Sequence, residues 1–361
     1  MKKVMVVMAE RTGTGHKSAA NAISKKLTPH GFEVELVDAF PLMGKKGEWM
    51  ENIYIPLTIK APALWSLSYN FSQTFTGAIH GSMKRSMKKA FIKKLEESKP
   101  DIIITVHSMF TKAISDILKK QNLNIPLYVG VVDLVKPPRL WFDKDATHSF
   151  VPTEIIKQDF IKRGMPEEKV TVYGFPVRDD IVVRKEPKEI KDKINILLVN
   201  PSVNLKKNVK FVKEVSKIEN ANINVICGRD EGLYNELTKL QKENIISNDV
   251  KIHGFVTNMH EFLNNSHIIL TKAGPNMMIE ALKSVTAVVV TGHIPGQEKH
   301  NHEYVTENGY GIQCENPNKI YNELNNFISS GKINEALQNI LKCDIQNGAE
   351  VMANYLIEKY K

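Results

Sequence analysis

Residues 2–16 decide the fold, because they read KKVMVVMAERTGTGH and lead directly into the alanine-rich stretch Lys17–Leu27. The apolar run Val4–Ala9 shows no alternation of polar residues, which is typical of a strand buried on both faces of a parallel sheet. In the stretch that follows, apolar side chains recur at helical spacing: Ala19, Ala20, Ile23 and Leu27. The pattern predicts a strand, a glycine loop and a helix.

The same alternation of short strands and helices continues along the chain. In the first half, strands are predicted at 33–37, 101–106 and 127–132, a helix at 109–119, and a long irregular segment before residue 101. In the second half, strands are predicted at 194–199, 223–227, 250–255, 268–270 and 287–290. This order predicts two doubly wound α/β domains facing each other across a cleft, with ligands bound beyond the carboxyl ends of the strands.

The length of 361 residues also favours two domains, since single cores stop growing at roughly 250 to 300 residues. A charged stretch with one proline, residues 182–193, has the composition of a surface linker. We therefore expect an N-terminal domain over residues 1–180, a linker over 181–193 and a C-terminal domain over 194–345. Residues 346–361 are expected to form a helix that packs back on the N-terminal domain.

The net charge of +9 is concentrated in the first hundred residues, which hold 16 Lys and Arg against 8 Asp and Glu. Such asymmetry suggests an acidic partner, either nucleic acid or an anionic membrane surface. The three scattered cysteines support neither a disulfide framework nor a thiolate metal site, and they fit a reducing cytoplasm. The apolar run after Lys2 and Lys3 is too short for a secretory signal or a membrane span.

The strongest candidate site follows the strand predicted at 268–270. Gly274 permits a close turn, Pro275 suits the first helical position, and the amides of Asn276 and Met277 then point at whatever lies above them. Such a helix start favours an anion, and a diphosphate suits it. Glu280 is placed to accept hydrogen bonds from a ribose diol, although an ordinary capped helix with a solvated Glu would show the same residues.

A second loop, Pro295–Asn301, follows the next strand. Gln297 and Glu298 present an amide beside a carboxylate, which suits a sugar, and Asn301 closes the loop. A polar surface loop is the alternative.

Three titratable residues follow strands of the first domain. His16, His107 and Asp133 could form an acceptor site, with His16 first and Asp133 second as general base. Each could instead be a structural hydrogen-bond partner.

The segment 52–82 is apolar and aromatic, with Lys60 as its single charged residue, and Trp65 and Phe71 lie within it. Met83, Met87, Phe91 and Leu95 then recur every four residues beside a basic set that includes Lys84, Arg85, Lys88 and Lys89. The pattern favours a helix lying on an anionic bilayer. A helix facing the protein core with a solvated basic face is the alternative.

Taken together, these motifs resemble those of the monogalactosyldiacylglycerol synthases and the bacterial processive diacylglycerol glucosyltransferases. The similarity extends from the first strand to about Gly311, and its elements occur in the family's order. They are 13–16 (GTGH), 99–107 (KPDIIITVH), 132–133 (VD), 174–178 (GFPVR), 272–275 (KAGP) with Glu280, and 295–299 (PGQEK). The loop Asn200–Asn204 departs from the glycine cluster usual in the family.

The resemblance implies a GT-B fold and an inverting transfer of a hexose from UDP-glucose or UDP-galactose to diacylglycerol. It implies that the helix at Gly274 holds the diphosphate, Glu280 the ribose, Gln297 and Glu298 the sugar, and the backbone at Phe255 the uracil. His16 faces the reacting centre, and His107 belongs to the acceptor side.

The resemblance further implies that residues 52–95 engage membrane and acceptor, so that the enzyme is peripheral on the inner face of the cell membrane. No metal, cofactor or nucleic acid is expected. The alternatives are a related enzyme acting on a polyprenyl-linked acceptor, a UDP-sugar epimerase, and a non-catalytic lipid-binding or nucleic-acid-binding protein.

Overall fold

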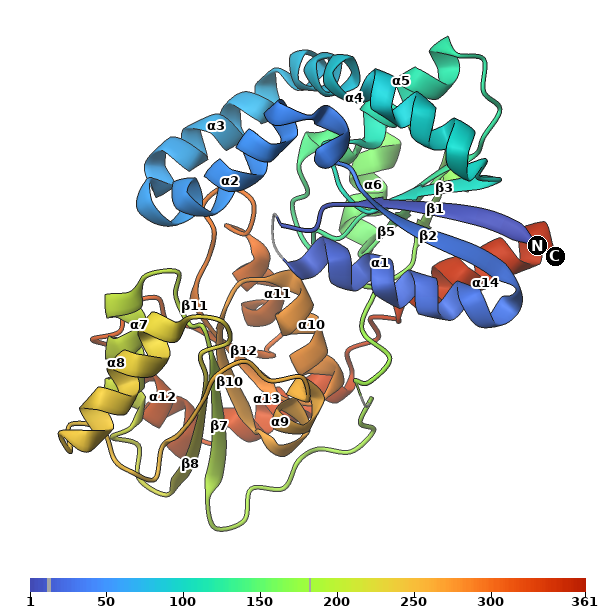
Figure 1. Cartoon of the computed structure of the whole chain (residues 1–361). Helices are drawn as coiled ribbons and strands as arrows, with labels where there is room; N and C mark the ends of the chain where they lie inside the picture. The colour runs from blue at the N-terminus through green and yellow to red at the C-terminus, as the bar shows by residue number, and fades with distance from the viewer. Residues whose placement is uncertain (12–13, 182) are drawn as a thin grey trace. The chain divides into compact units, whose positions relative to one another are not determined.

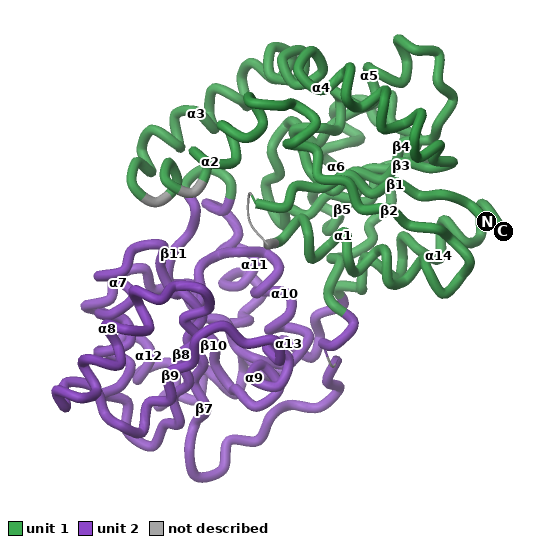
Figure 2. The backbone as a smooth tube through the Cα atoms, in the orientation of Figure 1, with its two compact units in different colours: residues 1–178, 295–297, 345–361 green, residues 179–294, 298–344 purple. Residues whose placement is uncertain are grey.

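The computed structural model describes residues 1–11, 14–181 and 183–361. Thr12 and Gly13 of the glycine loop and Val182 of the predicted linker lie outside the described residues. The chain divides into two compact units (Figure 2). Unit 1 comprises residues 1–178, 295–297 and 345–361, and unit 2 comprises residues 179–294 and 298–344.

Unit 1 is built on a parallel six-stranded sheet of order β2-β1-β3-β4-β5-β6. Its strands are β1 (Lys2–Met8), β2 (Phe32–Asp38), β3 (Ile102–Thr105), β4 (Leu127–Gly130), β5 (His148–Val151) and β6 (Val170–Val172). Its helices are α1 (Thr14–Leu27), α2 (Lys45–Lys60), α3 (Pro62–Thr74), α4 (Thr76–Ser98), α5 (Thr111–Lys120), α6 (Glu154–Lys162) and α14 (Gly348–Tyr360) (Figure 1).

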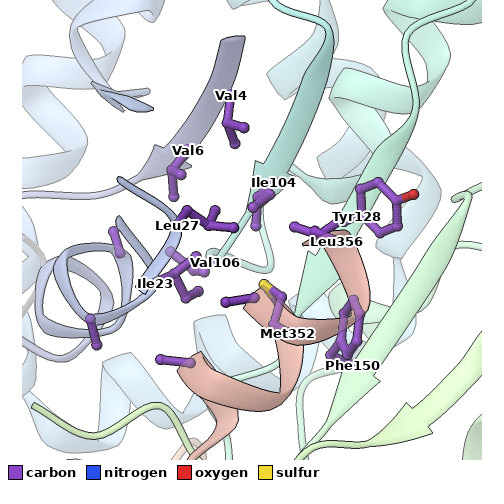
Figure 3. Close-up of a cluster of buried hydrophobic side chains, with 14 of the residues drawn as sticks. Val4, Val6, Ile23, Leu27, Ile104, Val106, Tyr128, Phe150, Met352 and Leu356 are labelled. Atoms are coloured by element: carbon purple, nitrogen blue, oxygen red, sulfur yellow. The ribbon is translucent and has the colours of Figure 1, made fainter. Parts of the chain in front are cut away.

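Strand β1 is buried on both faces, as its sequence predicts. Val4 and Val6 pack on one face with α1 and α14 (Figure 3). Met8 belongs to the same cluster. Met5 and Val7 point to the other face, against α4 and α5. Alternate residues of one strand thus join two separate hydrophobic clusters, which is why the run must be apolar without interruption.

The prediction that the apolar stripe of residues 83–95 lies on a membrane is wrong. The apolar stripe of α4, formed by Met83, Met87, Phe91 and Leu95, is buried in the core against β1 and α5. Four-residue spacing marks one buried face of a helix, and that face is covered here by protein. Among the basic residues, Lys84 forms an ion pair with Asp116 at 3.0 Å, whereas Arg85, Lys88 and Lys89 are exposed.

The irregular segment expected before residue 101 is also helical. Helix α2 continues through Pro56, and α3 begins directly after Ala61 with Pro62 at its first position. A proline removes only one backbone donor and suits a helix start, so neither residue prevents a helix here.

The C-terminal helix α14 returns to unit 1, where Met352 and Leu356 pack against β1, β3 and β4. The chain enters it past Gly174, which adopts φ +78°; a Cβ there would come within 2.2 Å of the carbonyl oxygen of Gln346. The amide of Phe175 donates to that carbonyl at 3.1 Å, and the amide of Gly348 donates to the Phe175 carbonyl at 2.9 Å. Only glycine permits so close an approach at positive φ.

Unit 2 repeats the architecture with the sheet order β12-β11-β10-β7-β8-β9. Its strands are β7 (Ile194–Val199), β8 (Ala221–Ile226), β9 (Lys251–His253), β10 (Ile268–Lys272), β11 (Ala287–Gly292) and β12 (Gly311–Gln313). Its helices are α7 (Leu205–Val215), α8 (Glu231–Lys242), α9 (Met259–Asn265), α10 (Pro275–Lys283), α11 (Asn301–Thr306), α12 (Ile320–Ser329) and α13 (Lys332–Leu341). The order reverses beside β7, so the ends of β7 and β10 flank the switch point where doubly wound sheets bind ligands.

The charged stretch 182–193 is not wholly at the surface. Lys188 is buried, and its Nζ donates to the carbonyls of Leu263 and Ser266 and to the hydroxyl of Thr286, each at 2.6 Å. Burial lowers the pKa of Lys188 to about 6. This stretch is therefore attached to unit 2 through the end of α9.

We predict that Phe91→Ala lowers the free energy of unfolding of the protein by about 3 to 5 kcal/mol, because it empties a fully buried site in the core of unit 1. Phe71→Ala removes the same side chain from an exposed position on α3, and it should change the free energy of unfolding by less than about 0.5 kcal/mol. Urea unfolding of both variants measures the difference. Equal losses would contradict a core-facing α4.

Candidate active site

The carboxyl ends of β1 and β3 are neighbours at the switch point of the unit 1 sheet. His16 lies in the first turns of α1, after β1, and His107 follows β3. The structure brings these two predicted residues together, with ring centroids 4.3 Å apart. Neither ring could be placed beside the other from sequence spacing alone, because β1 and β3 are separated by almost one hundred residues.

His16 is held by the last part of the β3 segment. Its Nδ1 lies 2.7 Å from the carbonyl oxygen of Val106. A carbonyl can only accept, so Nδ1 carries the proton and Nε2 is left with a lone pair. Burial lowers the pKa of His16 to about 4, opposed by the bond to Val106. His16 is therefore neutral near pH 7, in the form that accepts a proton.

His107 is buried and held in the opposite way. The amide of Met109 donates to its Nδ1 at 3.3 Å, so the ring proton resides on Nε2. The ring also packs against Phe40 and Phe110, with centroids 5.7 and 5.0 Å away. Burial, with His16 beside it, holds the pKa of His107 well below its usual value.

Asp133, the second predicted base, follows β4. It is buried, and its Oδ2 accepts a hydrogen bond from the indole Nε1 of Trp141 at 2.5 Å. Burial raises the pKa of Tyr69, and the negative charge of Asp133 adds to that rise. The carboxylate is therefore fixed in position close to the side of the cavity that Tyr69 lines.

An apolar cavity of about 310 Å³ in unit 1 has both histidines in its wall. Most of the remaining lining is hydrophobic and comes from α2, α3, the start of α4 and the segments before α2 and after β4: Phe40, Trp49, Met50, Ile53, Tyr54, Leu57, Trp65, Ile79 and Leu140. Polar groups are few, which is the usual composition of a site for a small apolar ligand. The cavity thus places two imidazoles at the wall of a hydrocarbon-like space.

Helix α3 has two different faces. Trp65, Tyr69 and Ser72 line the cavity, and Trp65 also packs edge-on against Tyr54 at 5.2 Å. Leu64, Leu67 and Phe71 lie on another face, followed by Phe75 at the end of the helix; these four, which we call the α3 ridge, are 50% to 66% exposed. Trp65 and Phe71, predicted together as acceptor or membrane residues, therefore have separate surroundings.

In unit 2, α10 begins as predicted directly after β10. Gly274 is its N-cap in an extended conformation, and Pro275 occupies the first helical position. The first amides of a helix have no intrahelical partner, so Asn276 and Met277 present free N–H groups at this end. The positive end of the helix dipole adds to their attraction for an anion.

Glu298 is buried beside this helix start. Its Oε2 accepts from the amide of Ile294 at 2.8 Å, while Oε1 lies 3.7 Å from where a Cβ of Gly274 would stand. Burial raises the pKa of Glu298, opposed by Lys272 and His293. Oε2 thus maintains the turn between Ile294 and Glu298, and Oε1 is left facing the start of α10. Gln297, the preceding residue, groups with unit 1.

Two further residues that were predicted to bind the sugar donor are buried in unit 2. Glu280 is on α10 and only 4% exposed. Asn301, at the start of α11, donates from Nδ2 to the carbonyl of Ala273 at 2.9 Å. Asn301 therefore supports the turn that precedes α10.

Phe255 lies just beyond β9, which ends earlier than the sequence predicts. Its ring is 61% exposed, with the Arg229 guanidinium 5.0 Å from its centroid. These residues line a groove of about 690 Å³ at the ends of β8 and β9, together with Gly228, Glu231, Tyr234, Asn235 and Gly254. The groove is open enough to admit a planar ring.

The loop Asn200–Asn204 keeps a glycine-like conformation without glycine. Asn200 adopts φ +41°, a region that Asn tolerates better than most residues. The hydroxyl of Thr291 donates to the Pro201 carbonyl at 2.6 Å, and Asn208 Oδ1 accepts from the Ser202 amide at 2.6 Å. The loop is therefore firmly held despite its unusual sequence.

Both units match known protein domains. Residues 16–177 match the model of the monogalactosyldiacylglycerol (MGDG) synthase family, and residues 197–347 match that of the glycosyltransferase family 28 C-terminal domain. Unit 1 thus carries an MGDG synthase domain, and unit 2 carries a C-terminal domain of glycosyltransferase family 28. The match ends and resumes close to the boundary between the units.

Two relatives match the chain across both units. MGDG synthase 3 of Arabidopsis thaliana is 28% identical over 95% of this chain and 78% of its own length. A processive diacylglycerol β-glucosyltransferase of Bacillus cereus is 25% identical over 88% of this chain and 84% of its own. The resemblance drawn from the motifs is confirmed, and the non-catalytic alternative and the epimerase are not favoured.

Solved structures confirm the GT-B fold. MurG of Acinetobacter baumannii superposes with a TM-score of 0.65 over 99% of this chain and all of that one, at 15% identity. Over the part of the chain that the structure describes, no helix is both long and apolar enough to cross a bilayer.

Sequence reasoning missed the groups that hold the predicted residues in place. Val106 acts through a backbone carbonyl, which no sequence pattern reveals. Phe40 and Phe110 were part of apolar stretches without a functional signal, and Tyr69 lay in a segment expected to be irregular. The one signal in the sequence was that His16, His107 and Asp133 each follow a predicted strand, which indicates the carboxyl edge of the sheet.

We predict that Asn301→Leu lowers the free energy of unfolding by about 1 to 3 kcal/mol, because the buried Ala273 carbonyl loses its partner. It should also weaken nucleotide binding, since this turn positions the start of α10. Glu307→Gln is the matched control, because Glu307 is exposed and lies just after α11, the helix that Asn301 begins. Urea unfolding and UDP titration calorimetry report the two effects, and an unperturbed Asn301→Leu protein would contradict this role.

Proposed function

We propose that this enzyme transfers a hexose from a UDP-sugar to the hydroxyl of diacylglycerol, with inversion at the anomeric carbon. The observation that carries the proposal is a neutral histidine, His16, in the wall of an apolar cavity. A proton acceptor beside a hydrocarbon-like space suits an acceptor that is a lipid alcohol. The activities named for two relatives, monogalactosyldiacylglycerol synthesis and diacylglycerol glucosylation, agree with this chemistry.

The donor is proposed to bind unit 2 at the switch point of its sheet. The free amides of Asn276 and Met277 take the diphosphate, and Glu280 takes the ribose. Glu298 Oε1 and Gln297 contact the sugar, and the groove at Phe255 takes the uracil. The hexose is either glucose or galactose, which differ at a single hydroxyl.

In the proposed step, His16 Nε2 accepts the proton of the glycerol hydroxyl as its oxygen attacks the anomeric carbon. A new C–O bond forms, and the bond from that carbon to the β-phosphate oxygen breaks, its electron pair leaving with UDP. The departing charge is stabilised by the amides and dipole of α10. We propose that no metal ion is needed for this. Within residues 1–11, 14–181 and 183–361, no group of three or more His, Cys, Asp or Glu side chains could hold one.

The α3 ridge is proposed as the contact with the membrane. It is a row of exposed apolar side chains on the same helix whose other face lines the acceptor cavity. A lipid acceptor then needs to pass only this helix to leave the bilayer. Exposed Arg85, Lys88 and Lys89 on α4 favour anionic lipids, at about 1 kcal/mol for each basic residue near the surface.

We place the enzyme on the inner face of the cell membrane as a peripheral protein. The three cysteines are free, as is usual in a reducing compartment.

His16→Asn should lower kcat about 100-fold or more, because the amide retains a donor for the Val106 carbonyl but cannot take the proton. The assay follows UDP release with UDP-glucose or UDP-galactose and a short-chain diacylglycerol. His30→Asn, at an exposed position, is the control and should leave the rate unchanged.

No UDP release by the wild-type protein with either donor would overturn the proposed function. An unchanged rate in His16→Asn would instead transfer the role of base to another residue.

Replacing Leu67 and Phe71 together by Ser should reduce binding to vesicles containing anionic lipid by about tenfold or more, since two exposed apolar side chains no longer enter the bilayer. Ile155→Ser changes an equally exposed apolar residue on α6 and should have no effect. Vesicle sedimentation compares the two, and equal binding by both variants would contradict the assignment of the α3 ridge.

A further inference from the structure

We propose that His107 is a second substrate-contacting residue, and that His16 and His107 together bind one hydroxyl group of the acceptor at the edge of the ring pair. His16 accepts the hydroxyl proton, and His107 donates to a lone pair of the same oxygen. This inference rests on the proposed function for the identity of the acceptor, but the arrangement of the two rings does not.

The two rings are opposite tautomers. The Val106 carbonyl can only accept and the Met109 amide can only donate, so His16 carries its proton on Nδ1 and His107 on Nε2. In each ring the other nitrogen, Nε2, has no hydrogen-bond partner among the described residues. One ring therefore offers a lone pair and the other an N–H group.

Both residues border the same space. The two rings are 4.3 Å apart, and both line the apolar cavity of unit 1. A hydroxyl group is a donor and an acceptor at once, so it can satisfy both nitrogens. A carbonyl or a carboxylate offers no proton for His16, and an ammonium group offers no lone pair for His107. The pair is thus selective for an alcohol.

The surroundings of the two histidines preserve their positions and their tautomers. Phe40 and Phe110 hold the His107 ring by edge and tilted contacts. Burial lowers the pKa of both histidines, so neither gains the second proton that would make both rings donors.

In the transfer step, the hydroxyl proton moves to His16 Nε2 while the oxygen forms its bond to the anomeric carbon. The His107 proton stays on its own Nε2 throughout. Its hydrogen bond strengthens as negative charge develops on the attacking oxygen, so His107 stabilises the transition state more than the bound acceptor.

The tautomers are tested first, on the full-length protein with ¹⁵N-labelled histidine at pH 7. His16→Asn and His107→Gln assign the ring signals. We expect a protonated Nδ1 in His16 and a protonated Nε2 in His107. A His107 ring protonated at Nδ1 would overturn the proposal, whatever substrate the enzyme uses.

The hydroxyl contact is tested with short-chain diacylglycerol and with its 3-deoxy analogue, which lacks the hydroxyl group. His107→Leu should lower kcat/KM for the alcohol by about 10- to 100-fold. The inhibition constant of the analogue should differ by no more than about twofold between His107→Leu and the wild-type protein. His107→Gln, whose amide can replace the Nε2 donor, should recover part of the rate.

Equal loss for alcohol and analogue would show a packing role and overturn the proposal, as would an unchanged rate in His107→Leu. If the wild-type protein transfers nothing to diacylglycerol, the proposed function fails, while the tautomer measurement still decides whether the pair exists.

Discussion

The hydrogen bond from His16 to the Val106 carbonyl is the interaction on which the account of this protein depends. It joins the first helix to the end of β3, and it determines which ring nitrogen of His16 can take a proton. A backbone acceptor keeps its position as long as the sheet is intact. The chemistry of the site is therefore set by strand order, because β1 and β3 must be neighbours for this bond to form.

The rest of unit 1 holds that strand pair in place. Residues of β1 alternate between two hydrophobic clusters, one completed by α14 and the other by α4 and α5. The return of the C-terminal helix depends on Gly174, where the backbone of residue 346 leaves no room for a side chain. The last residues of the chain thus help to hold the first strand, and both ends of the chain lie side by side in unit 1 (Figure 1).

Most strands and the start of α10 could be predicted from sequence because they depend on local patterns, whereas β5, β6 and β12 were missed and α1 begins earlier than predicted. Val4–Ala9 has no polar residue, and Gly274-Pro275 is a helix start wherever it follows a strand. The role of α4 could not be predicted in this way, since the spacing of Met83, Met87 and Phe91 is the same for a helix on a membrane and a helix on a sheet. Only the fold shows what covers that face.

The candidate site was predicted in part for a similar reason. His16, His107 and Asp133 follow strands, and that rule placed them at one edge of the sheet. Their protonation could not be derived, because it depends on Val106 and Met109, which contribute only backbone groups. The burial of Lys188 was missed as well, since a lysine among charged residues normally indicates solvent.

We propose that His16 acts as a base that stays neutral at pH values well below the usual pKa of histidine. The pH dependence of kcat/KM for a short-chain diacylglycerol tests it most directly, since this quantity reports the free enzyme. The neutral form is the active one and burial lowers its pKa to about 4. We therefore expect no acid-side loss of activity near pH 6.5, and a fall only as the pH approaches about 4. A fall centred near pH 6.5 would contradict the account.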